Sequence, residues 1–270
     1  MMFAWQTYFG SEEDRRRTEL AIRLQAFYSC VDNYDAFQDA NWKPEFWAPI
    51  RSAIETYSSQ RRCKVLEVGA GKTAFTEYLG DLLRERLEFH VQDITERNQA
   101  YLNTVADKVY FCDVTGIRES YDIIFSTFVY EHMTQPRATV GHLLTLLRAG
   151  GSIFIASPRY DFPGYLSPSV RHLSRATQLA VASQLLFRRL RVLLGGSPLF
   201  LLHFDPAAFH GAWFRDADAV HWPSLWDLKR ELAGRAALRR IHISARGLRG
   251  RFWARFLLLF VRITRASSTP

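Results

Sequence analysis

Residues 64–75 constrain the fold of this chain more than any other stretch of its 270 residues. A short apolar segment carrying one acidic residue, Glu67, leads into two closely spaced glycines, Gly69 and Gly71. Apolar side chains then recur at helical spacing from Phe75 onward. This order predicts a strand, a tight glycine turn and a helix, which is how an α/β sheet commonly meets a nucleotide-type cofactor.

The glycine turn is compatible with more than one cofactor. Glycine permits positive φ and a close approach of ligand to backbone, and any strand–helix turn can use it. Residues 71–73 resemble the end of a phosphate-binding P-loop, but Leu66 stands where that loop needs its first glycine, so the loop is too short. A dinucleotide site tolerates Ala74 in place of a third glycine, but Glu67 inside the strand end is unusual for that class.

Apolar and amphipathic segments alternate after the glycine turn. We expect strands at 64–68, 88–92, 108–111, 121–125 and 152–156, with helices at 75–86, 96–106 and 137–147. Two helices, at 12–30 and 46–57, are expected before the first strand. Five strands joined by helices predict an α/β fold with a parallel, doubly wound sheet and right-handed crossovers.

Asp93 stands 22 residues after Gly71, at the end of the second predicted strand. A carboxylate there can accept hydrogen bonds from both ribose hydroxyls of a nucleoside, and the spacing suits one strand–helix unit. The alternative is an N-terminal helix cap, because Thr95 and Glu96 follow. A nicotinamide dehydrogenase uses the same acidic residue, so Asp93 does not distinguish the two enzyme classes.

Residues 67–71 (Glu-Val-Gly-Ala-Gly) resemble motif I of the class I S-adenosylmethionine (SAM)-dependent methyltransferases. The resemblance continues after the third strand at 112–114 and after the fourth strand, where Glu131-His132 is typical of a branch that methylates small molecules, including quinone precursors. The Leu-Arg-Ala-Gly-Gly-Ser turn at 147–152 also resembles the family. These motifs follow the family's order and spacing across residues 60–160, and they argue against a dehydrogenase.

The resemblance implies SAM as the cofactor. Glu67 is expected near its amino-acid portion, Asp93 at the ribose and Asp113 at the exocyclic amino group of adenine. The residues assigned to the cofactor are Glu67, Gly69, Ala70, Gly71, Asp93, Ile94, Asp113, Val114, Thr127 and Phe128.

The resemblance also suggests residues for the acceptor side. His132 is the candidate general base, because histidine titrates near neutral pH; the alternative is a helix-start residue that contacts backbone or the cofactor carboxylate. No metal is expected, since no second ligand cluster joins Glu131 and His132. Arg159, Tyr160 and Tyr165 follow the fifth strand, where this family commonly shapes its acceptor pocket, although a simple turn would explain them equally well.

The family fold implies a Rossmann-like sheet of seven strands, the last two at 238–244 and 252–264. We therefore divide the chain into four parts. These are an N-terminal helical cap (1–60), a SAM-binding core (61–160), an acceptor-side insertion or lid with the last helix (161–235), and a C-terminal strand pair of the same sheet (236–270). The aromatic side chains expected to line the acceptor pocket, or simply to pack, are Tyr34, Phe37, Trp42 and Trp47.

The net charge of +8 is unevenly distributed. Residues 1–160 carry 18 Lys and Arg against 21 Asp and Glu (18 − 21 = −3), whereas residues 161–270 carry 17 against 6 (17 − 6 = +11). The basic half is either a solvated arginine-rich surface or a contact for one of three partners: an acceptor molecule, RNA, or an anionic membrane surface reached through the amphipathic 175–202 region. The acceptor expected for the methyltransferase is a small-molecule, lipid-like or glycan-linked one, methylated on oxygen in preference to nitrogen or carbon. RNA is disfavoured because no RNA-binding module is present.

The N-terminal ten residues lack a basic start followed by an apolar run, so we expect no signal peptide. Arginines interrupt the longest apolar runs, so we expect no transmembrane helix. These features predict a cytoplasmic protein, with peripheral contact to the inner face of a membrane as an open alternative. A non-catalytic, methyltransferase-like protein at such a surface is the remaining rival function.

Overall fold

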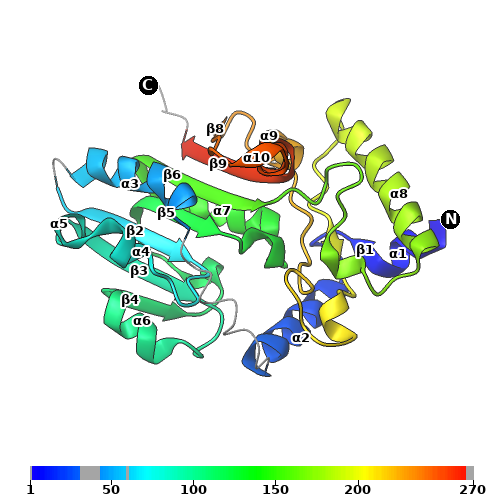
Figure 1. Ribbon diagram of the computed structural model, residues 1–270, viewed down its shortest axis with the longest axis horizontal. Helices are drawn as coiled ribbons and strands as arrows, with labels where there is room; N and C mark the ends of the chain where they lie inside the picture. The colour runs from blue at the N-terminus through cyan, green and yellow to red at the C-terminus, as the bar shows by residue number, and fades with distance from the viewer. Residues whose placement is uncertain (1, 31–42, 59–60, 266–270) are drawn as a thin grey trace.

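The computed structural model describes residues 2–30, 43–58 and 61–265, and its centre is a seven-stranded sheet (Figure 1). The strands are β2 (Cys63–Val68), β3 (Leu87–Asp93), β4 (Lys108–Phe111), β5 (Tyr121–Thr127), β6 (Leu147–Pro158), β8 (Ala236–Arg240) and β9 (Leu258–Arg265). Their order is β4-β3-β2-β5-β6-β9-β8, with β9 antiparallel to both neighbours and β2 to β6 parallel. The predicted α/β fold with a mostly parallel, Rossmann-like sheet is confirmed.

Helices cover both faces of this sheet. One face packs against α3 (Pro44–Ser58), α4 (Phe75–Leu79), α5 (Asp81–Arg84) and α6 (Gln99–Val105), and the other against α7 (Pro136–Leu146) and α9 (Leu225–Glu231). Val65 and Leu66 are adjacent on β2, are both fully buried, and belong to opposite apolar clusters. Successive side chains of a strand point to opposite faces, so a strand covered on both sides reads as a continuous apolar run.

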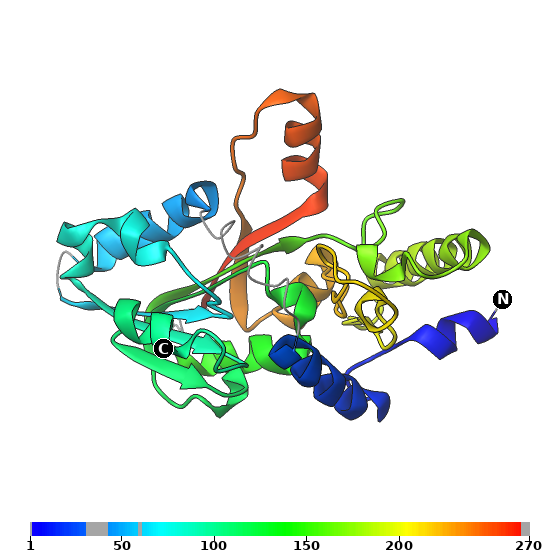
Figure 2. The same cartoon turned by 60° about the horizontal axis from the view of Figure 1, so that its bottom comes forward.

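Two predicted elements differ from the structure. The helix expected at 75–86 is divided into α4 and α5 at Gly80, whose φ of +73° breaks the helical path. The strand expected at 252–264 begins only at Leu258, because the preceding residues form α10 (Gly247–Phe252) and a π-helical turn, Trp253–Leu257. Figure 2 shows this helical arm standing away from the sheet, where no neighbouring strand is available to pair with it.

The N-terminal segment and the insertion between β6 and β8 pack together. They comprise α1 (Met2–Tyr8), β1 (Phe9–Gly10), α2 (Arg16–Cys30), α8 (Arg175–Leu193) and β7 (Leu202–His203). β1 pairs with β7, and Figure 1 shows these elements gathered beyond the arrowheads of the parallel strands. Among the described helices, none combines the length and the apolar character that crossing a bilayer requires.

The aromatic residues expected at the acceptor pocket fall into two groups. Tyr34, Phe37 and Trp42 lie outside the described residues. Trp47 is 1% exposed, and its ring lies 5.6 Å from the rings of both Phe75 and Tyr78. Trp47 is therefore a core residue of α3 rather than a pocket residue.

Candidate functional site

A cavity of about 490 Å³ opens at the carboxyl ends of β2, β3, β4 and β5. The chain runs from β2 outward to β3 and β4 and then crosses to β5 on the other side of β2, and α/β sheets bind ligands where the strand order reverses in this way. The predicted residues that line it are Gly69, Gly71, Asp93, Ile94, Asp113, Val114, Phe128 and His132. Helix α2 closes another side with Thr18, Ile22 and Tyr28. Glu67, Ala70 and Thr127 lie at the same strand ends but are not part of the cavity wall.

The glycine turn adopts a conformation that suits glycine. Gly69 and Gly71 have φ values of +71° and +55°, in the left-handed region. The Gly69 N–H donates to the backbone oxygen of Gln92 at 2.9 Å. A Cβ atom on Gly69 would lie 2.4 Å from Val129 Cγ1, so only glycine lets the turn pack against the loop that leads to His132.

Asp93 fixes the glycine turn. Its Oδ2 accepts the Gly71 N–H at 2.9 Å, and its Oδ1 accepts the Thr95 N–H at 3.0 Å. Burial raises the pKa of Asp93, and these backbone donors oppose that effect. Helix α6 begins only at Gln99, so Asp93 does not cap it. The carboxylate therefore stands at the cavity wall, held in place by the turn it stabilises.

Asp113 and Val114 follow β4 in the same way. The Asp113 carboxylate accepts the Thr115 N–H at 2.8 Å and begins a short 3-10 helix, Val114–Gly116. Val114 is 6% exposed and presents an apolar wall to the cavity. The end of the cavity beyond the glycine turn and Asp93 therefore offers both a hydrogen-bond acceptor, the Asp113 carboxylate, and an apolar surface, Val114.

Glu67 is a buried carboxyl beside a partly buried lysine. Its side chain is 3% exposed, and Oε2 has no hydrogen-bond partner among the described residues. Burial raises the pKa of Glu67 to about 8, although Thr73 and Lys43 oppose the shift. The Lys43 ammonium lies 3.4 Å from the Thr127 carbonyl oxygen and 5.2 Å from the centre of the Phe128 ring. Desolvation lowers the pKa of Lys43, with the charge of Glu67 opposing.

His132 is held by a buried carboxylate from the insertion. Its Nδ1 lies 3.2 Å from Asp218 Oδ2, and Asp218 also accepts the Tyr28 hydroxyl at 2.8 Å and the Trp213 indole N–H at 3.1 Å. Burial by itself would lower the pKa of His132, but the charges of Asp218 and Glu131 outweigh it, so the pKa is raised. His132 is therefore oriented and more basic than an ordinary histidine.

Glu131 completes an acidic cluster around His132. Its side chain is fully buried, and its Oε2 accepts a hydrogen bond from the Ser157 hydroxyl at 2.8 Å. Its Oε1 lies 4.0 Å from His132 Nε2 and has no hydrogen-bond partner among the described residues. Burial raises the pKa of Glu131 to about 7. Asp216 brings a third possible metal ligand within 4.8 Å of Glu131 and His132, which sequence reasoning did not find.

The three residues expected to bind the acceptor do not line the cavity. Arg159 Nε lies 3.3 Å from Asp161 Oδ1. Tyr160 is fully buried and donates its hydroxyl to Asp216 at 2.5 Å, so it supports the acidic cluster. The Tyr165 ring lies 5.5 Å from the Tyr160 ring. Their proposed contact with an acceptor stays a prediction.

Sequence reasoning missed Lys43, Tyr28, Asp216 and Asp218. Each comes from a segment with no motif, and 86 residues separate His132 from Asp218. The sequence pointed to Asp216 and Asp218 only in a general way. Acidic residues are rare after residue 160, and two of the six stand at 216 and 218.

Comparison with known proteins shows the family and the fold. A family model described as "Methyltransferase domain" matches residues 25–232. A malonyl-[acyl-carrier protein] O-methyltransferase from Paenibacillus sp. (strain JDR-2) is 27% identical over 147 residues, which cover 49% of this chain and 52% of that protein. The match therefore spans only about half the length of this relative.

A solved structure shares the fold. The 1,6-didemethyltoxoflavin-N1-methyltransferase from Burkholderia thailandensis, crystallised with 1,6-didemethyltoxoflavin and S-adenosylhomocysteine, has a TM-score of 0.54. The alignment covers 93% of this chain and 90% of that chain at 14% identity. At this identity, the comparison shows that the two proteins share a fold.

Proposed function

Because this chain belongs to the methyltransferase domain family and is a SAM-dependent enzyme, we propose that it methylates a small-molecule acceptor held between α2, the insertion and the carboxyl edge of the sheet. The observation that supports the proposal is one cavity lined by the glycine turn, Asp93, Asp113 and His132 together. Sequence motifs from four separate strand ends meet there.

The residues of the cavity fit SAM. Behind the cavity wall, the unpartnered Oε2 of Glu67 would accept a hydrogen bond from the ammonium group of the methionine portion. Asp93 accepts from the ribose hydroxyls, and Asp113 with Val114 receives the adenine edge and face. The open backbone at Gly69 and Gly71 lets the cofactor lie close to the turn. When bound, SAM supplies a methyl group on a positively charged sulfur, which needs alignment rather than activation.

The proton of the acceptor is proposed to go to His132. Asp218 holds Nδ1, which leaves Nε2, 4.0 Å from Glu131 Oε1, as the atom that would receive the proton, and His132 and Phe128 line the same cavity. The raised pKa makes the imidazole a stronger base when it is neutral. Oxygen is the proposed nucleophile, because the matched Paenibacillus relative is an O-methyltransferase and a hydroxyl group carries a proton for this base to accept.

Calorimetry with SAM and S-adenosylhomocysteine tests cofactor binding. Asp93→Ala should weaken binding by at least about 10-fold, because even one hydrogen bond to a charged acceptor contributes about 1.5–3 kcal/mol. Asp81→Ala, an exposed carboxylate on α5, is the matched control and should bind normally. A folded wild-type protein that binds neither ligand would reject the proposal.

Turnover identifies the acceptor class. The protein is incubated with SAM and a metabolite or lipid extract, and mass spectrometry detects the gain of one CH₂ unit. His132→Gln should abolish turnover while leaving SAM affinity within a few fold. Equal turnover by His132→Gln would remove His132 from the mechanism.

Peripheral contact with an anionic membrane is a second proposal. Helix α8 exposes an apolar stripe, of which Phe187 is 68% exposed and Leu179 70%. The stripe comprises Leu179, Leu186, Phe187, Leu190, Leu193 and Leu194. Exposed arginines at 175 and 191 accompany it, and α8 contains no acidic residue. A basic amphipathic helix of this kind suits anionic lipid headgroups.

Vesicle flotation tests this contact. Wild-type protein should float with anionic vesicles but not with neutral ones, and Phe187→Ser should weaken flotation. Leu82→Ser, which replaces an equally exposed leucine on α5, is the control. Steeply salt-dependent binding to RNA, without flotation, would instead favour the RNA alternative.

A further inference from the structure

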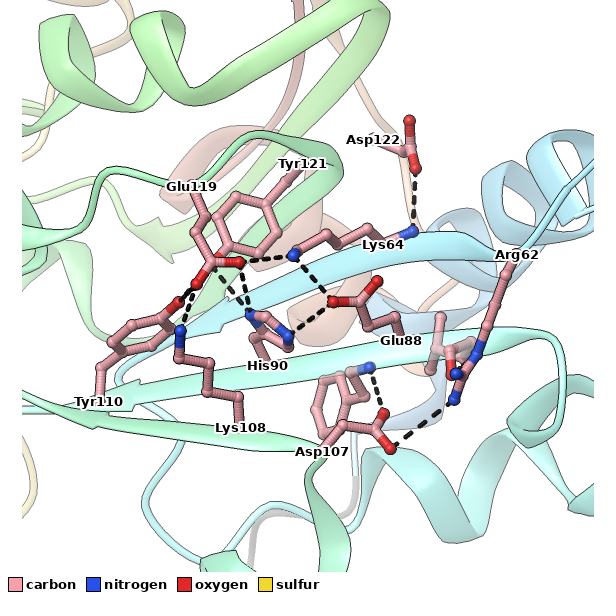
Figure 3. A network of polar contacts seen from close by, with 12 residues as sticks. Arg62, Lys64, Glu88, His90, Asp107, Lys108, Tyr110, Glu119, Tyr121 and Asp122 are labelled. Atoms are coloured by element: carbon pink, nitrogen blue, oxygen red, sulfur yellow. Dashed lines mark hydrogen bonds and ion pairs between the residues drawn. The ribbon is translucent and has the colours of Figure 1, made fainter.

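Three clusters of possible metal ligands occur in the part of the chain that the structure describes. Figure 3 shows the first, Glu88, His90 and Glu119. Lys64 already lies 2.8 Å from Glu88 and 2.5 Å from Glu119, and Lys108 also contacts Glu119. These ammonium groups neutralise the carboxylates, so the cluster is an ion-pair network. The second cluster, around Glu131, belongs to the candidate active site.

The third cluster lies within the insertion. His172 follows a 3-10 helix at Pro168–Val170, and Asp205 follows β7. His210 ends another 3-10 helix, Ala207–Phe209. Their ligand atoms all lie within 4.8 Å of one another. Three short loops therefore bring two imidazoles and one carboxylate to one point, away from the cofactor cavity.

The geometry of this cluster suits a metal ion. Asp205 Oδ1 lies 2.8 Å from His210 Nε2, and Asp205 Oδ2 lies 3.6 Å from His172 Nε2. Ligands about 2.05 Å from a tetrahedral ion are separated by about 3.4 Å. The pair at 3.6 Å already has this separation, and the pair at 2.8 Å needs to open by only about 0.6 Å.

The two imidazoles are arranged in parallel. Their ring centres are 4.3 Å apart and their planes are inclined by 12°, so the rings are stacked, and both Nε2 atoms lie within 3.6 Å of the Asp205 carboxylate. Because a metal ion lies in the plane of each imidazole that binds it, one of the two rings must turn when the ion binds. The Nε2 atom of His172 is shielded from solvent and makes no hydrogen bond in the described structure. An unsatisfied buried nitrogen is costly, and a bound cation would satisfy it.

We propose that His172, Asp205 and His210 bind a divalent transition-metal ion, for which Zn²⁺ is the probe. Two imidazoles and a carboxylate suit Zn²⁺ rather than Mg²⁺ or Ca²⁺, which prefer oxygen ligands. The fourth coordination position is open to water, because His210 is 43% exposed.

The bound ion restrains the segment of the insertion that carries Asp216 and Asp218 to the candidate active site. Asp216 and Asp218 follow His210 within eight residues along the chain. Joining Asp205 and His210 to His172 restricts the start of that segment. Metal binding is therefore expected to stabilise the insertion, and it is measurable without any assay of methyl transfer.

Titration of metal-free protein with ZnCl₂ tests the site. We expect one saturable site in the wild type, at least 10-fold weaker binding in His210→Ala and Asp205→Asn, and unchanged binding in His242→Ala, an exposed histidine elsewhere. Co²⁺ should give the visible absorption of a four-coordinate ion. Zn²⁺ at 100 times its Kd should raise the Tm by about 5–10 °C in the wild type and much less in the two site variants.

Two results would overturn the proposal. One is a wild-type protein that binds no Zn²⁺ saturably. The other is unchanged affinity in both His210→Ala and Asp205→Asn when circular dichroism shows that they are folded. In the second case, loss of binding in His132→Ala would assign the ion to the cluster around Glu131 instead.

Discussion

Replacing Gly69 with alanine measures how tightly the glycine turn is packed. Two separate costs are expected. The φ of +71° places an L-residue in the left-handed region, at a cost of about 1–2 kcal/mol. The new Cβ would also lie 2.4 and 2.5 Å from the two Cγ atoms of Val129, and overpacking of this kind costs about 1–3 kcal/mol. The free energy of unfolding should therefore fall by about 2–5 kcal/mol.

Two further variants separate these costs. Gly234 has a φ of +75° and no atom within 4 Å of its missing Cβ, so Gly234→Ala should lose only about 1–2 kcal/mol. The double variant Gly69→Ala with Val129→Ala removes the two Cγ contacts, while the Val129 Cβ stays 3.0 Å from the new methyl group, and should recover part of the overpacking cost of about 1–3 kcal/mol as a coupling energy. Val129 also lines the cavity, so Gly69→Ala alone should weaken SAM binding as well.

Urea unfolding at fixed pH gives the stability of each variant, and calorimetry gives its affinity for SAM. The decisive comparison is between Gly69→Ala and Gly234→Ala. If both lose the same stability, and the double variant shows no coupling, the close contact with Val129 has no energetic weight. The account of the glycine turn as a packed junction would then be wrong.

Four other variants test the charges. Burial raises the pKa of Glu67 from 4.5 to about 8, so the protonated side chain contributes its full stability below pH 4.5 and this contribution is lost as the pH rises to 8. Between pH 4.5 and 8.5, the free energy of unfolding of Glu67→Gln should therefore rise by up to about 5 kcal/mol relative to that of the wild type, as measured by urea unfolding. An equal difference between variant and wild type at both pH values contradicts this expectation. Asp218→Asn removes a charge that raises the pKa of His132, so the acidic limb of the kcat profile should move to lower pH, and an unmoved limb would count against His132 as the base. Asp227→Asn leaves Arg189, 4% exposed, with Asp161, 3.8 Å away, as its remaining buried carboxylate and should cost about 3–5 kcal/mol in the free energy of unfolding. Arg189→Met should cost less, because two backbone N–H groups still bond Asp227, and a larger loss than in Asp227→Asn would refute that order.

The positions of β2, β3, β5 and β6 along the chain were predictable because these strands are largely buried on both faces. A run such as Val65–Leu66 must be apolar at successive positions, and this signal survives without tertiary information. Elements that depend on a neighbour were predicted less well. The residues before Leu258 are as apolar as a strand, but no partner strand lies beside them, and apolar side chains four apart at Leu248, Phe252 and Phe256 follow a helical period instead.

The candidate site likewise contains residues that could be predicted from the sequence and residues that could not. Gly69, Asp93 and Asp113 each stand at the end of a predicted strand, so parallel pairing brings them to one edge without further information. Lys43 and Asp218 reach that edge from segments whose path depends on packing. Their roles could not be predicted from local pattern, since a carboxylate acquires its function from the residue it faces.

By itself, the sequence determined the βα alternation, the glycine turn and the strand-end carboxylates, because each rests on contacts between residues close in the chain or on burial of a whole strand. Only the tertiary structure decided that Asp218 orients His132, that Tyr160 supports Asp216 rather than lining the cavity, and that His172, Asp205 and His210 converge. The physical reason is that loops of the insertion are positioned by packing against β1 and the N-terminal helices, and no local periodicity encodes where such loops meet.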